Sequence, residues 1–198
     1  MFKTYISPSL LDAFTNNYDW IAMVKREEKE ISVAMQNGID WEKAVIEGEF
    51  EELNEIINGG LYQQMVYGSL DKFFLFGYAD IVKYDTVIDL KFKANYDFPS
   101  YYNSNQRLIY PYLLGLDNFS YIIGTGTDVH NPTSICREDY TRDDNLLRER
   151  LFDFDRAIDH FGLREIYEQN YSMDRIIERI EDDKSILNTK GEKICVLH

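Results

Sequence analysis

Two stretches dense in apolar residues, 73–82 and 87–92, have the pattern of paired β-strands. The second stretch alternates with a period of two, as a strand does when its two faces meet different surroundings. Residues 83–86 lie between the two stretches and can form a turn. The pattern therefore predicts a β-hairpin. One face of its second strand carries Ile88, Leu90 and Phe92, and the other carries Val87, Asp89 and Lys91.

Apolar residues elsewhere recur at helical or strand spacing. Helical spacing predicts helices in residues 7–26, 31–57, 142–161 and 171–186, the second of them broken near Gly38 and Gly48. A further helix is expected to begin near Ser100 or Ser104, and strands are expected in residues 61–68 and 119–127. No internal repeat or long linker interrupts the 198 residues, which predicts one domain with a helical C-terminal part at about residues 140–190.

The predicted hairpin brings three charged residues to one face. If the turn is centred between Tyr84 and Asp85, Asp80 lies opposite Asp89, with Cβ atoms about 4.5–5.5 Å apart. Two carboxylates this close repel, so the pair tends to hold a proton or a divalent cation. Lys91 points into the same space. Two oxygen ligands and one ammonium group suit the hydrolysis of a phosphodiester.

Four short motifs resemble the PD-(D/E)xK nuclease superfamily, in its RecB-like and phage exonuclease branch. The motifs run in the family's order: Gly38-x-x-Trp41-Glu42, Gly77-x-x-Asp80, Asp89-Leu90-Lys91 and Gln106-x-x-x-Tyr110. They cover about residues 30–125. The resemblance implies an α/β (α+β) fold with a restriction-endonuclease-like core, in which a central mixed β-sheet is flanked by helices. The C-terminal helices would then be an extension of that core.

The same resemblance implies roles for individual residues. Asp80 and Asp89, with Glu42 and the carbonyl of Leu90, would coordinate Mg²⁺ or Mn²⁺. Glu49 is the alternative to Glu42 as the upstream acidic residue. Lys91 would position or help to deprotonate the attacking water, and Gln106 would orient the water or the scissile phosphate. The expected contacts to substrate are Lys93, Arg107 and Tyr110.

The overall charge opposes binding to nucleic acid. The chain has 35 acidic and 21 basic residues and a formal net charge of −14, whereas nucleic-acid-binding proteins usually carry a basic surface. Acidic and basic residues balance between Asp71 and Tyr112, so the excess of acid lies outside this stretch. We therefore expect weak affinity of the isolated chain for nucleic acid, or delivery of the substrate by a partner.

The small number of cysteines, two, favours a reducing cytoplasm, and the lack of a long apolar run predicts no membrane contact. A composition rich in Asn, Tyr and Ile fits a bacterial or phage-encoded protein. The sequence predicts a divalent-metal-dependent nuclease, expected to be a DNA exonuclease of recombination, repair or phage DNA processing. RNA is not excluded as substrate. A homo-oligomer, or a phage or recombination protein partner, would fit this role. The first alternative is a catalytically silent binding subunit of a nucleic-acid-processing or anti-defence complex. The second is a metal-dependent hydrolase of small phosphorylated molecules.

Overall fold

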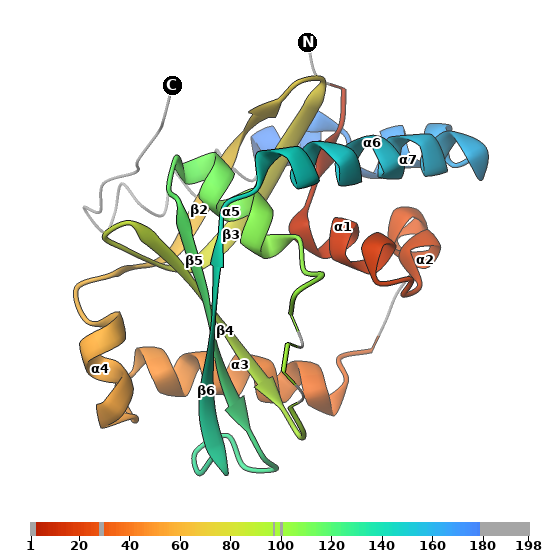
Figure 1. Ribbon diagram of the computed structural model, residues 1–198. Coiled ribbons are helices and arrows are strands. Elements are labelled where there is room, and N and C mark those ends of the chain that lie inside the picture. The colour runs from red at the N-terminus through yellow and green to blue at the C-terminus, as the bar shows by residue number, and fades with distance from the viewer. Residues whose placement is uncertain (1–2, 28–29, 97, 100, 179–198) are drawn as a thin grey trace.

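The computed structural model describes residues 3–27, 30–96, 98–99 and 101–178, which form one mixed sheet and its flanking helices (Figure 1). The strands are β1 (Tyr5–Ile6), β2 (Leu61–Leu70), β3 (Phe73–Lys83), β4 (Thr86–Lys93), β5 (Asn118–Thr125) and β6 (Ser134–Thr141). The helices are α1 (Pro8–Thr15), α2 (Trp20–Lys25), α3 (Val33–Ile46), α4 (Glu51–Ile57), α5 (Gln106–Leu114), α6 (Asp144–His160) and α7 (Arg164–Asn170).

The long strand β3 organises the sheet. One of its edges pairs with β2 in antiparallel orientation along most of its length. Its other edge is shared, because β1 pairs with it in parallel near Phe74 and β4 pairs with it in antiparallel orientation near Ile81. Beyond β4 come β5, which is parallel to it, and then β6, which is antiparallel to β5. The predicted central mixed sheet flanked by helices is confirmed.

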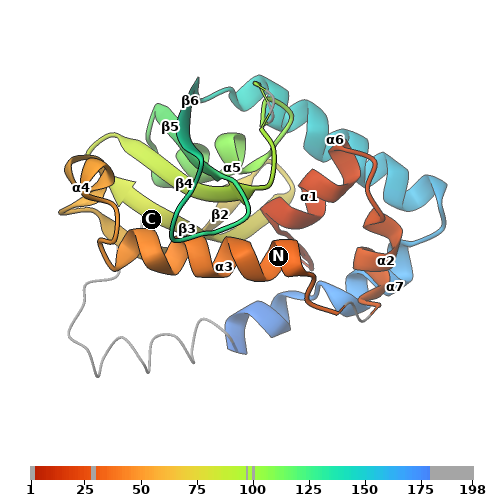
Figure 2. The same cartoon turned by 90° about the horizontal axis from the view of Figure 1, so that it is seen from below.

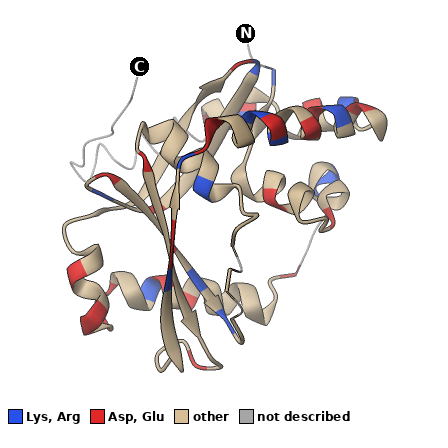
Figure 3. Ribbon diagram, viewed as in Figure 1, with Lys and Arg blue, Asp and Glu red and all other residues tan. Residues whose placement is uncertain are grey.

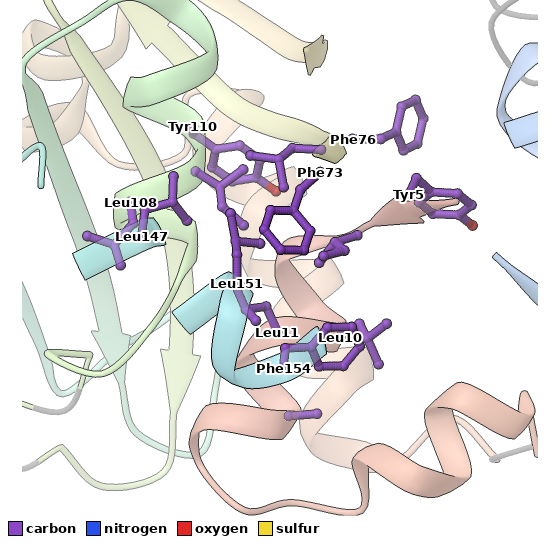
Figure 4. Close-up of a cluster of buried hydrophobic side chains, with 14 of the residues drawn as sticks. Tyr5, Leu10, Leu11, Phe73, Phe76, Leu108, Tyr110, Leu147, Leu151 and Phe154 are labelled. Carbon is purple, nitrogen blue, oxygen red and sulfur yellow. The ribbon is translucent and has the colours of Figure 1, made fainter. Parts of the chain in front are cut away.

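Helices cover both faces of the sheet, and each face has its own core. Seen from below, α3 runs along one face while α5 lies beyond the other (Figure 2). The core under α3 and α4 is centred on Trp41, which is fully buried and packs on Phe50, Phe92 and the backbone of Gly124. The core on the opposite face joins α1, α5 and α6 to β3 (Figure 4). Its labelled members are Tyr5, Leu10, Leu11, Phe73, Phe76, Leu108, Tyr110, Leu147, Leu151 and Phe154.

Helix α6 ties the C-terminal part of the chain to that second core. The side chain of Asp143 caps the helix by accepting a hydrogen bond from the backbone N–H of Leu146. Apolar residues then recur three or four positions apart and are buried against the core, namely Leu147, Leu151, Phe154 and Ile158. Acidic and basic residues alternate along the rest of its surface (Figure 3). No helix within the described ranges is long and apolar enough to cross a membrane.

The hairpin formed by β3 and β4 has the predicted register. Lys83 pairs with Thr86, Val82 with Val87, and Ile81 with Ile88, so the turn is centred between Tyr84 and Asp85. Burial also follows the predicted faces. Val87 lies in the core with α1, α5 and α6, whereas Ile88 and Leu90 lie in the core with α3 and α4.

Other predicted elements need correction. Residues 7–26 form two helices rather than one, because Asn17 takes a left-handed conformation (φ 55°) and Asp19 caps a new helix. Tyr18 lies exposed in the connection between them. Helix α3 continues through Gly38, while the break near Gly48 (φ 83°) is confirmed.

Three elements were not predicted from the sequence. They are β1, which has only two residues, the polar edge strand β6 and the short helix α7. In the helix expected at residues 171–186, residues 173–178 are helical, and residues 179–186 lie outside the described ranges.

Candidate active site

The strand pair β3–β4 opens at the position of the two aspartates. Its ladder ends at the pair Ile81 and Ile88, one step short of the predicted pair of Asp80 and Asp89. The carboxylate of Asp80 instead accepts a hydrogen bond of 2.8 Å from the backbone N–H of Leu90. Asp80 is therefore held in the opening by the backbone of β4, rather than by cross-strand pairing.

Asp89 is a buried carboxylate that the described part of the chain leaves almost without hydrogen-bond donors. It is 0% exposed and lies in the middle of the sheet, next to Tyr121 of β5. Lys91 forms an ion pair with it, and no other described residue donates a hydrogen bond to either carboxylate oxygen. Burial raises the pKa of Asp89, and Lys91 offsets part of that rise. A buried carboxylate with so few donors has capacity to bind a further group.

Electrostatic interactions link Asp80, Asp89 and Lys91. Burial raises the pKa of Asp80 well above its usual value, and repulsion from Asp89 and Glu42 raises it further. Burial on its own lowers the pKa of Lys91, but Asp89, Asp80 and Asp12 raise it by more. Lys91 therefore remains a charged ammonium group at neutral pH. Its Nζ atom lies 5.8 Å from the centre of the Tyr121 ring.

Glu42 of α3, and not Glu49, lies close enough to Asp89 and Lys91 to interact with their charges. Burial raises the pKa of Glu42, followed by repulsion from Asp89, while Lys91 lowers it. Its Oε1 atom accepts a hydrogen bond from Gln63 of β2. Glu49 lies apart, because it is paired at 2.7 Å with His130 on the exposed surface. Of the two glutamates that the sequence offered as the upstream acidic residue, the structure places Glu42 beside the aspartates and Glu49 beside His130.

Gln106 and Tyr110 bring α5 to the same site. Gln106 is the first residue of α5, which begins later than the predicted Ser100 or Ser104. Burial, and then Asp89 and Asp80, raise the pKa of the buried residue Tyr110, and the neighbouring side chain of Gln106 offsets part of that rise. The helix approaches β3 closely at Gly77. A Cβ atom there would lie 2.9 Å from Cε1 of Tyr110 and 3.1 Å from Cδ of Pro8.

Replacing Gly77 with alanine should therefore disturb the site as well as the packing. The new methyl group would push Tyr110 and α1 away from β3, and we expect a loss of about 1–3 kcal/mol in the free energy of unfolding. Urea unfolding measures this loss. Gly38→Ala is the matched control, because nothing lies within 4 Å of that position. Equal stability of the two variants would contradict the close packing at Gly77.

The other two predicted substrate contacts, Lys93 and Arg107, both lie against tyrosine rings. Nζ of Lys93 lies 4.4 Å from the centre of the Tyr101 ring. Arg107, expected beside the site, is 5% exposed, and its Nε atom donates a hydrogen bond of 2.8 Å to the carbonyl of Tyr102. Its guanidinium group also lies against the ring of Tyr140 on β6. Arg107 thus belongs to a neighbouring cavity.

Sequence reasoning missed Asp12 of α1, which joins this helix to the start of α5. Its carboxylate accepts hydrogen bonds from Ser104 Oγ (2.8 Å), from Asn105 Nδ2 (2.9 Å) and from the backbone N–H of Asn105. Burial raises the pKa of Asp12, and the hydrogen bonds and Lys91 act against that rise. One signal was present in the sequence, since Asp12 is the one charged residue within the apolar run of residues 10–14.

Replacing Asp12 with alanine would leave the buried donors of Ser104 and Asn105 without an acceptor. Each unsatisfied buried donor costs about 1–3 kcal/mol, so we expect the free energy of unfolding to fall by roughly 2–4 kcal/mol. Asp12→Asn should cost less, because its carbonyl oxygen can still accept hydrogen bonds. Chemical denaturation of both variants measures the difference. A stable Asp12→Ala variant would show that this contact does not hold α1 to α5.

Asp80 and Asp89 could hold a hard divalent cation, but they supply only part of its ligands. No group of three or more His, Cys, Asp or Glu side chains close enough to hold a metal occurs in the described ranges. The buried carboxylate of Asp89 and the half-buried carboxylate of Asp80 interact here, and Asp89 lacks donors other than Lys91. Mg²⁺ is commonly held by one or two carboxylates, with waters and substrate phosphates completing its shell. The donor set of Asp80 and Asp89 suits that arrangement.

Comparison with known proteins gives a result for the fold only. No family model matches the sequence, and no curated protein matches it. Among solved structures, a protein named SSO0001 has a TM-score of 0.57 at 13% identity, covering 77% of this chain and 76% of its own. A presumed exonuclease from Eubacterium rectale has a TM-score of 0.56 at 17% identity, covering 84% of this chain and 82% of its own.

An alkaline exonuclease from Laribacter hongkongensis has a TM-score of 0.53 at 15% identity, covering 92% of this chain and 94% of its own. Identities this low establish a shared fold and not a shared activity. The chain therefore has the mixed α/β fold found in proteins described as exonucleases.

Proposed function

We propose that this protein is a divalent-metal-dependent nuclease of the PD-(D/E)xK type, closest in motif pattern to the RecB-like and phage exonuclease branch. The buried carboxylate of Asp89 supports this most strongly. Burying a charge with a single partner costs free energy, and groups buried in this way are concentrated at functional sites. Its motif neighbours Asp80 and Lys91 interact with it. The fold shared with exonucleases adds support.

Mg²⁺ or Mn²⁺ would be held by Asp80 and Asp89, with the carbonyl of Leu90 as a further ligand and Glu42 beside them. The ion would supply a Lewis acid and a water molecule acidic enough to attack at neutral pH. In this scheme the hydrogen bond from Leu90 N–H fixes the carboxylate of Asp80. Asp89 is fixed by its burial in the sheet and by Lys91.

Lys91 would stabilise negative charge on the phosphate or help to deprotonate the attacking water. Its ammonium group would also place the attacking water by hydrogen bonding. Gln106 would orient the water or the scissile phosphate, and Tyr110 would hold the Gln106 side chain in place. The substrate we propose is DNA, attacked from an end.

The acidic surface supports a second candidate, a catalytically silent subunit that keeps the nuclease fold. A net charge of −14 repels nucleic acid. The described residues also include no third carboxylate or histidine close enough to complete a metal site with Asp80 and Asp89. Such a subunit would bind a protein partner through its acidic surface.

Cleavage of matched linear and circular DNA in the presence of Mn²⁺ separates the two candidates. The wild-type chain should degrade the linear molecule and leave the closed circle intact. An Asp89→Asn protein, purified in parallel, excludes a contaminating nuclease if it cleaves neither substrate. No cleavage of either substrate by the wild type would contradict the nuclease and favour the silent subunit.

A further inference from the structure

A cavity of about 600 Å³ opens where α5 meets the beginnings of β4 and β5 and the end of β6. Tyr102, Arg107 and Tyr140 line it, together with Arg137 and Arg142. Its volume is within the range of about 300–1,000 Å³ typical of ligand sites. The lining includes three arginines and two aspartates, so it carries a net positive charge in a chain of net charge −14.

Arg107 is held rigidly in this cavity with much of its hydrogen-bonding capacity unused. Its guanidinium carbon lies 5.1 Å from the centre of the Tyr102 ring and 4.8 Å from that of Tyr140. Its Nε atom donates to the carbonyl of Tyr102. Within the described ranges, no carboxylate forms an ion pair with Arg107 or with its neighbour Arg150, which donates to the carbonyl of Asn103 and to Oδ1 of Asn105.

The basic residues of a second cavity of similar size have different partners from Arg107. That cavity, of about 580 Å³, is lined by Lys72, Asp155 and Arg164 among others. There Lys72 pairs with Asp155, and Arg164 pairs with Asp155 at 2.7 Å and Asp159 at 2.8 Å. In the cavity at Arg107 the two more exposed arginines are also paired, Arg137 with Asp139 and Arg142 with Asp144. A buried guanidinium without a carboxylate partner is therefore a feature of the cavity at Arg107, and it suits an anionic ligand.

Aromatic rings connect this cavity to the proposed nuclease site. Lys91 lies against Tyr121, and Tyr101 stacks on Tyr121 with ring centres 4.6 Å apart. Tyr121 also meets Tyr140 edge-on at 6.0 Å, and Tyr140 contacts Arg107. Tyr102, the residue after Tyr101, is 57% exposed beside that arginine. A series of ring and cation contacts, which passes through the fully buried ring of Tyr121, thus joins Lys91 to the cavity.

We propose that Tyr102 and Arg107 form a track that binds an unpaired nucleic-acid strand and leads it to Lys91, an inference that rests on the proposed nuclease function. A base stacks on the exposed ring of Tyr102, and a backbone phosphate binds the guanidinium group of Arg107. An unpaired strand exposes the faces of its bases, whereas a duplex hides them. Stacking also supplies affinity that does not depend on a net positive charge of the protein, and this chain has a net charge of −14.

Binding measured in EDTA tests the track without requiring cleavage. A fluorescently labelled single-stranded DNA oligonucleotide of mixed sequence is titrated with protein and followed by anisotropy, in parallel with a blunt hairpin duplex. The wild type should bind the single strand at least about tenfold more tightly than the duplex. Tyr102→Leu and Arg107→Met should each weaken single-strand binding by roughly tenfold, the range measured for the loss of one stacked base.

Phe152→Leu is the matched control, because this partly exposed ring lies 5.4 Å from Lys72 beside the other cavity. It should leave binding unchanged. If Arg107→Met does not fold, Tyr102→Leu still decides, since it alters an exposed ring.

Tighter binding of the duplex, or equal binding by Tyr102→Leu and Phe152→Leu, would overturn the track. Single-strand binding without any cleavage would support the track while contradicting the nuclease. Cleavage that Tyr102→Leu leaves unchanged, with unchanged binding, would contradict only the track.

Discussion

Replacing Asp89 with asparagine should abolish cleavage and leave the protein at least as stable as the wild type. Asparagine has nearly the same shape but removes one of two buried negative charges at the opening of the hairpin. We expect DNA cleavage to fall on the order of 10³-fold, the range seen when a key electrostatic group is removed from an active site. A residue with a purely structural role would show the opposite result, a large loss of stability.

The dependence of stability on pH tests whether the charge of Asp89 causes this effect. In the metal-free protein the pKa values of Asp80 and Asp89 are raised, so the folded state binds their protons more tightly than the unfolded state does. The stability of the wild type therefore falls as the pH rises from the unfolded value of about 3.9 through the raised folded values. Asp89→Asn should remove part of this fall. Thermal melting in EDTA between pH 4 and pH 8 measures it, and a variant less stable than the wild type at pH 8 would contradict the account.

Replacing Lys91 with methionine should lower activity and stability together. The side chain of Lys91 is 26% exposed, and its ammonium group lowers the pKa of both aspartates. Without it two buried carboxylates lose their counter-charge, and breaking such a pair costs several kcal/mol. We expect a loss of about 2–3 kcal/mol at pH 8 in EDTA, with stability recovering as acid protonates the carboxylates. Cleavage should fall by about 10²–10³-fold.

A double-mutant cycle gives the sharper measurement. Asp89→Asn combined with Lys91→Met should be more stable than Lys91→Met alone, because the charge that Lys91 offsets is then absent. Lys25→Met is the matched control, since Lys25 pairs with Glu27 on the surface and should change stability by less than about 0.5 kcal/mol. Additive effects of the two substitutions at the site would contradict a direct interaction between Asp89 and Lys91.

The hairpin and its charged face were predictable because two local signals agreed. The period-two pattern of β4 identified the strand, and the short polar turn fixed the register at Tyr84 and Asp85. The opening of the strands beyond Ile81 could not be predicted in the same way. It depends on a side-chain hydrogen bond from Asp80 to the backbone of the next strand, which no pattern of apolar residues reports.

Elements that depend on distant partners were missed or misplaced. Strand β1 has two residues and exists because β3 offers it an edge. Strand β6 is polar and exposed at alternate positions, so it lacks an apolar signature, and its pairing with β5 defines it. Arg107 was predicted to contact substrate from its place next to Gln106. Neighbouring helix positions point about 100° apart, so the sequence pattern could not show that its side chain packs on Tyr140 of β6.

Binding of Mn²⁺ tests the central claim most directly, because it does not require the substrate to be known. Isothermal titration of the wild type should show a site that Asp80→Asn and Asp89→Asn each abolish. Glu49→Gln serves as the control, since Glu49 is paired with His130 away from the hairpin, and it should bind as the wild type does. Undiminished binding by Asp89→Asn would contradict the claim that Asp80 and Asp89 form the metal site of a nuclease.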